Sequence, residues 1–141
     1  MQFLATTAKK LILYDNGKQT AIDQGNFYGL TWDNNKIYAS INNPHDHGYS
    51  EIKVYDKSFN HINTHPKQNR HDVHQILFYK GKLWVIITGK DTIEVGDKYI
   101  NFSGGQNISI QENIINDGDV LHLNSIFINN QVYVLGAKNN V

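Results

Sequence analysis

Short runs in which apolar and polar residues alternate fill most of the chain. In the stretch EIKVYDKSFNHI, for example, Ile52, Val54 and Ile62 recur at strand spacing among polar neighbours. Such alternation is typical of half-buried β-strands, because successive side chains of a strand point to opposite faces. No stretch shows the heptad or 3.6-residue period of an amphipathic helix. The pattern therefore predicts an all-β fold.

Three stretches repeat one hairpin pattern, in which an apolar strand is followed by a polar turn and a second strand. They are LTWDNNKIYAS from Leu30, ILFYKGKLWVI from Ile76 and SIFINNQVYVL from Ser125. The turns contain Asn and Gly, which tolerate the positive φ of two-residue hairpin turns. The predicted turn pairs are Asn34-Asn35, Lys80-Gly81 and Asn129-Asn130. Aromatic residues at matching positions predict packing between the copies: Trp32, Phe78 and Phe127 on the first strand, and Tyr38, Trp84 and Tyr133 on the second.

A second sequence motif, found outside the hairpins, completes the repeat. KLILYDNGKQTAI near the N-terminus resembles EIKVYDKSFNHI, with Tyr14-Asp15 matching Tyr55-Asp56. No hairpin precedes this first copy, and no such phrase follows the third hairpin. Phe78 follows Trp32 by 46 residues and Phe127 follows Phe78 by 49, while counting from Phe127 past the C-terminus back to Trp32 adds another 46. This spacing is typical of propeller blades and predicts three units of four strands in circular order.

These features predict a β-propeller domain over residues 1–141 with three four-stranded blades. Propellers need about four to eight blades, and a half-ring would leave strand edges unpaired, so we expect a homodimer to close a six-bladed ring with strand exchange between N- and C-termini. The expected parts are outer strands over 1–25 that the partner chain completes, whole blades over 26–70 and 71–118, and inner strands of the shared blade over 119–141. Two alternatives stay open: a fragment of a larger propeller, and a three-sheet prism closed within one chain.

Composition argues against several classes of partner and site. Thirteen Lys plus Arg balance thirteen Asp plus Glu, so no basic stripe favours nucleic acid as a partner. The chain has no cysteine, which excludes disulfides and thiolate zinc sites. In the first ten residues, MQFLATTAKK, the apolar run before the lysines is too short for a secretory signal. No apolar run in the sequence is long enough to span a membrane. We therefore expect a soluble cytoplasmic protein without a membrane partner.

Two phrases carry a resemblance to a known group of proteins. The chain resembles six-bladed β-propellers of the broad NHL-like and glutaminyl-cyclotransferase-like kind at the openings of their innermost strands. The two matching stretches are Asp72-Val73-His74-Gln75-Ile76 and His122-Leu123-Asn124-Ser125-Ile126. The first of them is followed by Gly81-Lys82-Leu83-Trp84-Val85, which resembles the second strand of such a blade. The resemblance covers nearly the whole chain as repeats, although the chain has half the length of those proteins. It implies a propeller fold, but these propellers include enzymes, lactonase-like metal sites and binding scaffolds, so it implies no single function.

The residues that open the innermost strands form the candidate site. In propellers these strands line a central channel, and ligands tend to bind at its mouth. The candidate ligand-binding residues are His71, Asp72, His74, Gln75, His122 and Asn124. One interpretation is that imidazole, carboxylate and amide groups hold a divalent metal or act as acid and base. The other is that His74, Gln75 and Asn124 are buried polar groups that bond to the backbone at the strand starts.

A second imidazole cluster, NNPHDHGYS, contains His45 and His47 on either side of Asp46. His-x-His in an extended segment would place both rings on one side, but Pro44 and Gly48 favour a tight turn and no third ligand is evident. We expect an exposed loop here. No phosphate-binding glycine motif or nucleophile elbow is present.

The sequence therefore predicts a homodimeric binding or scaffolding module, with a site for a small ligand or a protein at the channel mouth, no catalytic residues and no cofactor. The rival hypothesis is a metal- or histidine-dependent hydrolase or lyase with its site on the two-fold axis in the channel. An axial site made of two identical halves constrains asymmetric chemistry, which favours the binding module.

Overall fold

The computed structural model describes residues 1–43, 49–103, 107–112 and 121–136. As expected, this part of the chain is all-β, with antiparallel strands, one 3-10 turn (Thr88–Lys90) and no α-helix. Within these residues, no helix is long and apolar enough to cross a membrane.

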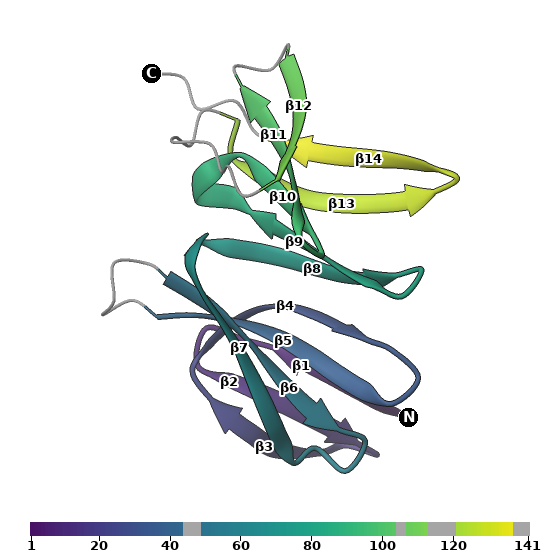
Figure 1. Cartoon of the computed structure of the whole chain (residues 1–141). Coiled ribbons are helices and arrows are strands. Elements are labelled where there is room, and N and C mark those ends of the chain that lie inside the picture. Colours follow the sequence, from purple (N-terminus) through teal and green to yellow (C-terminus); the bar gives the residue numbers. More distant parts are fainter. Residues whose placement is uncertain (44–48, 104–106, 113–120, 137–141) are drawn as a thin grey trace.

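The strands form four antiparallel sheets (Figure 1). The first contains β1 (Gln2–Thr6), β2 (Lys10–Asp15) and β3 (Lys18–Gln24). The second contains β4 (Asn26–Trp32), β5 (Lys36–Asn42), β6 (Tyr49–Asp56) and β7 (His61–His71). The third contains β8 (Val73–Tyr79), β9 (Lys82–Ile87), β10 (Thr92–Val95), β11 (Lys98–Ser103) and β12 (Asn107–Glu112), and the fourth contains β13 (Leu123–Asn129) and β14 (Gln131–Gly136). In each sheet, strands that are consecutive in the chain are neighbours.

The three predicted hairpins are confirmed as β4–β5, β8–β9 and β13–β14. Lys80 and Gly81 turn with φ of 48° and 75°, and Asn130 turns with φ of 57°. The first hairpin uses a different device, because its turn residues do not adopt positive φ. Instead, the Asp33 carboxylate accepts hydrogen bonds from the backbone N–H groups of Asn35, at 2.6 Å, and Lys36, at 2.7 Å. An aspartate that bonds to the backbone two residues later is a common substitute for a glycine turn.

The sheets lie in a row, with the β1–β3 sheet at one end and the β13–β14 hairpin at the other (Figure 1). In this row β4 contacts β8, and β8 contacts β13. Apolar side chains fill the space between neighbouring sheets: Leu11 and Phe27 between the first two, Val54 and Ile76 between the second and third, and Ile86 and Ile126 between the third and fourth. Each sheet is therefore held mainly by burial of apolar surface against its neighbours.

A buried ion pair joins the second sheet to the third. Arg70 donates from Nε and Nη2 to the two carboxylate oxygens of Glu94, at 2.9 and 2.8 Å, and from Nη1 to the carbonyl of His65 at 2.9 Å. The exposed fractions of the two side chains are only 4% and 5%. Because the pair is bidentate and the third donor is also satisfied, the desolvation of both charges is compensated.

The predicted packing of the repeat aromatics is confirmed only in part. Tyr38 is buried and Phe78 is half-buried, with their rings stacked at 5.7 Å, and Trp84 packs against the cluster between the third and fourth sheets. Trp32, Phe127 and Tyr133, however, are 67%, 62% and 53% exposed. These three residues do not pack in the core of the single chain, and their packing between blades stays a prediction.

Phe127 is exposed because the pairing of the third hairpin is shifted by one residue relative to the alignment of the repeats. Phe127 pairs with Tyr133, just as Leu77 pairs with Trp84, whereas Phe78 pairs with Leu83. The true counterpart of Phe127 is therefore Leu77. A shift of one residue moves a strand side chain to the opposite face of the sheet, so Phe127 and Phe78 point to opposite faces.

Strand β1 was not evident from the sequence pattern. It pairs with β2 in the register that β5 uses with β6: Phe3 lies opposite Tyr14, as Ile37 lies opposite Tyr55. The Thr6 hydroxyl donates to the carbonyl of Tyr28 at 2.6 Å, which anchors β1 to β4. The edge of β2 on which pairing with a partner chain was expected is thus occupied by β1.

Candidate functional site

The first strands of the three hairpins share a local irregularity. The pairing register shifts between Phe27 and Leu30 in β4, between Val73 and Gln75 in β8, and between Leu123 and Ser125 in β13. The residues within these shifts include Tyr28, His74 and Asn124. A β-bulge leaves an extra residue unpaired and redirects its side chain, and bulges are frequent next to functional sites. The three bulges place these side chains together.

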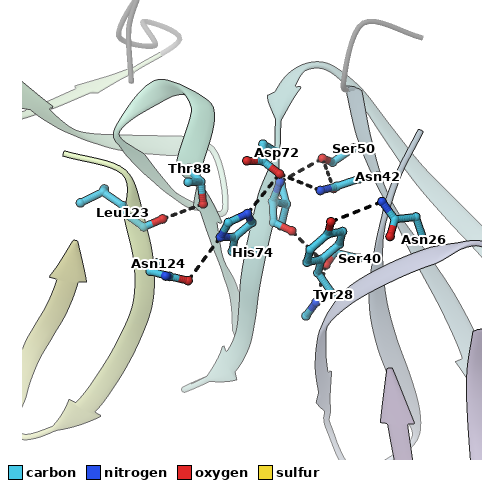
Figure 2. A network of polar contacts seen from close by, with 12 residues as sticks. Asn26, Tyr28, Ser40, Asn42, Ser50, Asp72, His74, Thr88, Leu123 and Asn124 are labelled. Atoms are coloured by element: carbon cyan, nitrogen blue, oxygen red, sulfur yellow. Dashed lines mark hydrogen bonds and ion pairs between the residues drawn. The ribbon is translucent and has the colours of Figure 1, made fainter. Parts of the chain in front are cut away.

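His74 lies at the centre of this group (Figure 2). Its Nδ1 is 3.2 Å from Oδ1 of Asn124, and its Nε2 is 3.2 Å from Oδ1 of Asp72. The ring stacks on Tyr28 with centroids 5.4 Å apart and planes 6° apart, and it meets the ring of His122 edge-on at 5.3 Å. We call Tyr28, Asp72, His74, His122 and Asn124 the His74 cluster.

Asp72 is held in place by a chain of polar groups. It adopts a φ of 52° in the single-residue connection between β7 and β8, a conformation that Asp tolerates better than most residues. Nδ2 of Asn42 donates to its carboxylate at 2.9 Å. The hydroxyl of Ser50 in turn donates to Oδ1 of Asn42 and accepts the N–H of Val73 at 3.0 Å. Asn42 and Ser50 are buried, so the orientation of Asp72 is fixed from inside the protein.

Two predicted site residues have other surroundings. The side-chain amide of Gln75 donates to the carbonyl of Ile126 at 3.3 Å and accepts the N–H of Ile126 at 2.7 Å. It thus joins β8 to β13 as a peptide group would. This agrees with the interpretation of Gln75 as a polar group that bonds to the backbone at the strand starts. His71 ends β7, and its ring packs against Tyr49 with centroids 4.5 Å apart. Asp72, His74, His122 and Asn124 are brought together as the candidate site requires.

Sequence reasoning placed Tyr28 at the opening of an innermost strand but not among the candidate ligand-binding residues, and it missed Asn42 and Ser50. The signal for Tyr28 was its place at the opening of the innermost strand of the first hairpin, followed by Gly29 where β4 approaches β8. A Cβ on Gly29 would lie 2.7 Å from the backbone nitrogen of Ile76. Asn42 and Ser50 carry no signal, because they reach Asp72 from β5 and β6 only after folding. His45, Asp46 and His47 lie outside the described residues.

The members of the His74 cluster differ in how far they are exposed to solvent. The Tyr28 residue is 40% exposed, the His74 side chain is 21% exposed and the Asp72 side chain is 41% exposed. Asn124 is exposed, and Nδ2 of Asn26 lies 3.4 Å from the Tyr28 hydroxyl. Partly exposed aromatic faces beside carboxamide groups suit the binding of a polar compound that contains a ring, by stacking and hydrogen bonding.

The geometry is less suited to a metal. Both ring nitrogens of His74 already face oxygen atoms, so a metal ion would have to displace Asp72 or Asn124. Among the described residues, no three His, Asp or Glu side chains are arranged so that they could hold a metal ion.

Comparisons with known proteins give no family for this chain. No protein-family model matches it, and no curated protein sequence matches it significantly.

Proposed function

We propose that this chain is a ligand-binding module, and that two copies of it form a homodimeric six-bladed β-propeller. In this proposal, the first strands of the hairpins, β4, β8 and β13, line the central channel. The His74 cluster lies at the channel mouth and binds a small polar compound that contains a ring. Gln75 positions β13 against β8, and the partner chain supplies a second, identical site.

The observation that carries the proposal is the convergence of the three bulges. Regular pairing would cost less than a bulge, since the ladder of hydrogen bonds is locally interrupted. The chain nevertheless has a bulge at the same place in all three first strands, and the bulged residues Tyr28, His74 and Asn124 meet. An arrangement that repeats in this way and is also solvent-accessible favours a binding role over a purely structural one.

The propeller arrangement is supported by the row of sheets. Three hairpins of one kind follow one another, each packed on the next. Within the described residues, β14 pairs only with β13 and β1 pairs only with β2, which leaves strand edges at both ends of the row. Such edges promote association with another chain. Three such hairpins per chain, each opening one proposed blade, together with those of a second copy reach the ring size that propellers need.

Saturation-transfer NMR on the wild-type protein tests the proposed site directly. The probes are a panel of pyranose sugars, nucleosides and aromatic amino acids. We expect signal transfer to one of these classes, with loss of transfer in His74→Ala and in Tyr28→Ala because the stacking surface is removed. His61→Ala is the matched control, since His61 is an exposed histidine on β7 whose ring contacts are Tyr55 and the hydroxyl of Thr64. Absence of transfer to every class, or equal transfer in His74→Ala, contradicts the proposal.

The rival function, a metal-dependent hydrolase or lyase on the two-fold axis, has a separate test. Elemental analysis of purified protein, before and after incubation with Zn²⁺, measures the metal bound to each dimer. One ion per dimer that is lost in His74→Ala would support the rival.

A further inference from the structure

Each hairpin of this chain has two faces, and the sheets pack by a constant rule. One face of β8–β9 carries Ile76 and Phe78 and packs toward β4–β5, where Phe78 stacks on Tyr38. Its other face carries Leu77, Trp84 and Ile86 and packs toward β13–β14. The later hairpin always covers the second face of the earlier one.

Polar contacts follow the same rule. The hydroxyl of Thr31 on β4 accepts the N–H of Phe78 on β8 at 2.9 Å. The side chain of Gln75 on β8 accepts the N–H of Ile126 on β13 at 2.7 Å. In both cases the earlier strand supplies a side-chain acceptor to the backbone of the later one. Successive hairpins are thus held together by hydrogen bonds with a fixed direction as well as by apolar contacts.

The rule leaves the second face of the third hairpin uncovered, and on the first hairpin it leaves one large side chain exposed beside the β1–β3 sheet. On the third hairpin, Phe127, Tyr133 and Leu135 occupy the positions of Leu77, Trp84 and Ile86, and they are 62%, 53% and 65% exposed. We call these three residues the trailing face. Equivalent side chains on β8–β9 are at most half-exposed because β13–β14 lies over them.

On the first hairpin, Trp32 on β4 occupies the position of Phe78 and is 67% exposed. Together with Leu30 it lines an apolar groove of about 350 Å³, to which Phe3, Leu4 and Leu13 also contribute. Leu30 also packs against the cluster that contains Leu11 of the β1–β3 sheet, so we call Trp32 and the groove beside it the leading face. In the two pairs of hairpins that pack within the chain, the residue at the position of Trp32 packs with the trailing positions of the hairpin before it.

We infer that the trailing face of one copy packs on the leading face of a second copy, and that the two such contacts of a dimer are identical. The occupant is a second copy because the packing rule places the second face of one hairpin against the position of Phe78 in the next, and Trp32, which holds that position on β4, is exposed beside a groove that the β1–β3 sheet leaves open. The contact is heterologous, since two different patches meet, and it closes a dimer because each chain contributes one patch to each contact. This inference rests on the dimer proposed above, and it adds the surfaces that form the dimer.

A mixing experiment tests this arrangement. Trp32→Glu damages the leading face and Leu135→Glu damages the trailing face, and both residues are already exposed in the single chain, so folding is expected to survive. Each variant alone carries damage in both contacts of its homodimer. We expect at least about a 100-fold rise in the dissociation constant of either variant, because the substitution opposes burial of a large apolar side chain in both contacts.

An equimolar mixture should regain dimers. In a mixed dimer one contact contains both substitutions, while the other joins two unaltered faces. Sedimentation velocity of the mixture should therefore show more dimer than either variant alone. If the wild-type protein is monomeric, if either variant stays fully dimeric, or if the mixture remains as dissociated as its components, the inference is wrong.

Cross-linking gives a second measurement that does not depend on weakened association. The chain has no cysteine, so Trp32→Cys and Tyr133→Cys each introduce a single thiol. Mild oxidation of the two variants together should give disulfide-linked heterodimers in excess over homodimers, whereas a random ratio of products contradicts the pairing. Circular dichroism verifies that all variants keep the β signal. The ligand experiment on His74 is read independently of both results.

Discussion

Single polar side chains join sheets that apolar packing brings together. Asp23 on β3 accepts hydrogen bonds from Nζ of Lys53 and from the hydroxyl of Tyr55, both at 2.8 Å, and so connects the first sheet to β6 of the second. Burial by itself would raise the pKa of the Asp23 carboxyl, but the hydrogen bonds from Lys53, Tyr55 and the backbone of Gln24 outweigh it and lower the pKa below 3.8. Burial, together with the hydrogen bond to Asp23 and the charge of Asp23, raises the pKa of Tyr55.

This contact predicts an acid-sensitive part of the stability. Because the pKa of Asp23 is lower in the folded state than in the unfolded state, its contribution is complete above 3.8 and is lost as the pH falls through the folded value. We expect Asp23→Asn to lower the free energy of unfolding at pH 7 by about 1–3 kcal/mol, with a smaller difference from wild type in strong acid. Urea denaturation at both pH values, at one protein concentration, measures this.

Asp15→Asn is the matched control for that measurement, since Asp15 is an exposed carboxyl in the same sheet. It should leave the free energy of unfolding almost unchanged at either pH. A loss for Asp23→Asn that is equally large in strong acid would contradict the role given to its ionised form.

At the scale of elements, the close approach of β4 to β8 positions the His74 cluster. The N–H of Gly29 donates to the hydroxyl of Ser40 at 2.7 Å, and β8 lies so near that a Cβ at this position would be 2.7 Å from the nitrogen of Ile76. Only a residue without a side chain fits between the two strands. Gly29 therefore holds Tyr28 within stacking distance of His74.

Gly29→Ala should consequently separate β4 from β8. We expect a loss of about 1–3 kcal/mol in the free energy of unfolding, together with shifts in the amide NMR signals of Ile76 and His74. Gly81→Ala is a useful comparison: its Cβ would meet nothing within 4 Å, but its φ is 75°. It should cost about 1–2 kcal/mol through backbone strain and leave the signals of β8 near His74 unmoved. Unshifted signals in Gly29→Ala would show that the strands are not in close contact there.

The elements also show what the sequence could predict. Alternation and turn residues sufficed for the three hairpins, because both are local properties. The bulges at Tyr28, His74 and Asn124 could not be predicted, since they depend on how neighbouring strands pack. The position of Phe127 was assigned incorrectly because the third turn is one residue shorter in its pairing than the second, which sequence alignment of the copies does not reveal. His74 and Asn124 were found because they open strands, whereas the Asn42 and Ser50 contacts arise only from folding.

At the scale of the whole molecule, the central claim is that one chain is half of a ring. Within the described residues, the exposed trailing face and the free edge of β14 lie at one end of the row of sheets, and the free edge of β1 lies in the sheet at the other end. The exposed Trp32 lines a groove with Phe3 and Leu4 of β1. Large apolar side chains that gather in this way usually mark an interface. A second copy would cover both ends at once and place two His74 clusters around one channel.

Sedimentation equilibrium of the wild-type protein tests this claim most directly. One chain has a mass of 16.1 kDa, and we predict twice that mass over a wide range of protein concentrations, with no growth into longer assemblies as concentration rises. A mass of 16.1 kDa in solution, with the β signal intact in circular dichroism, would contradict the account.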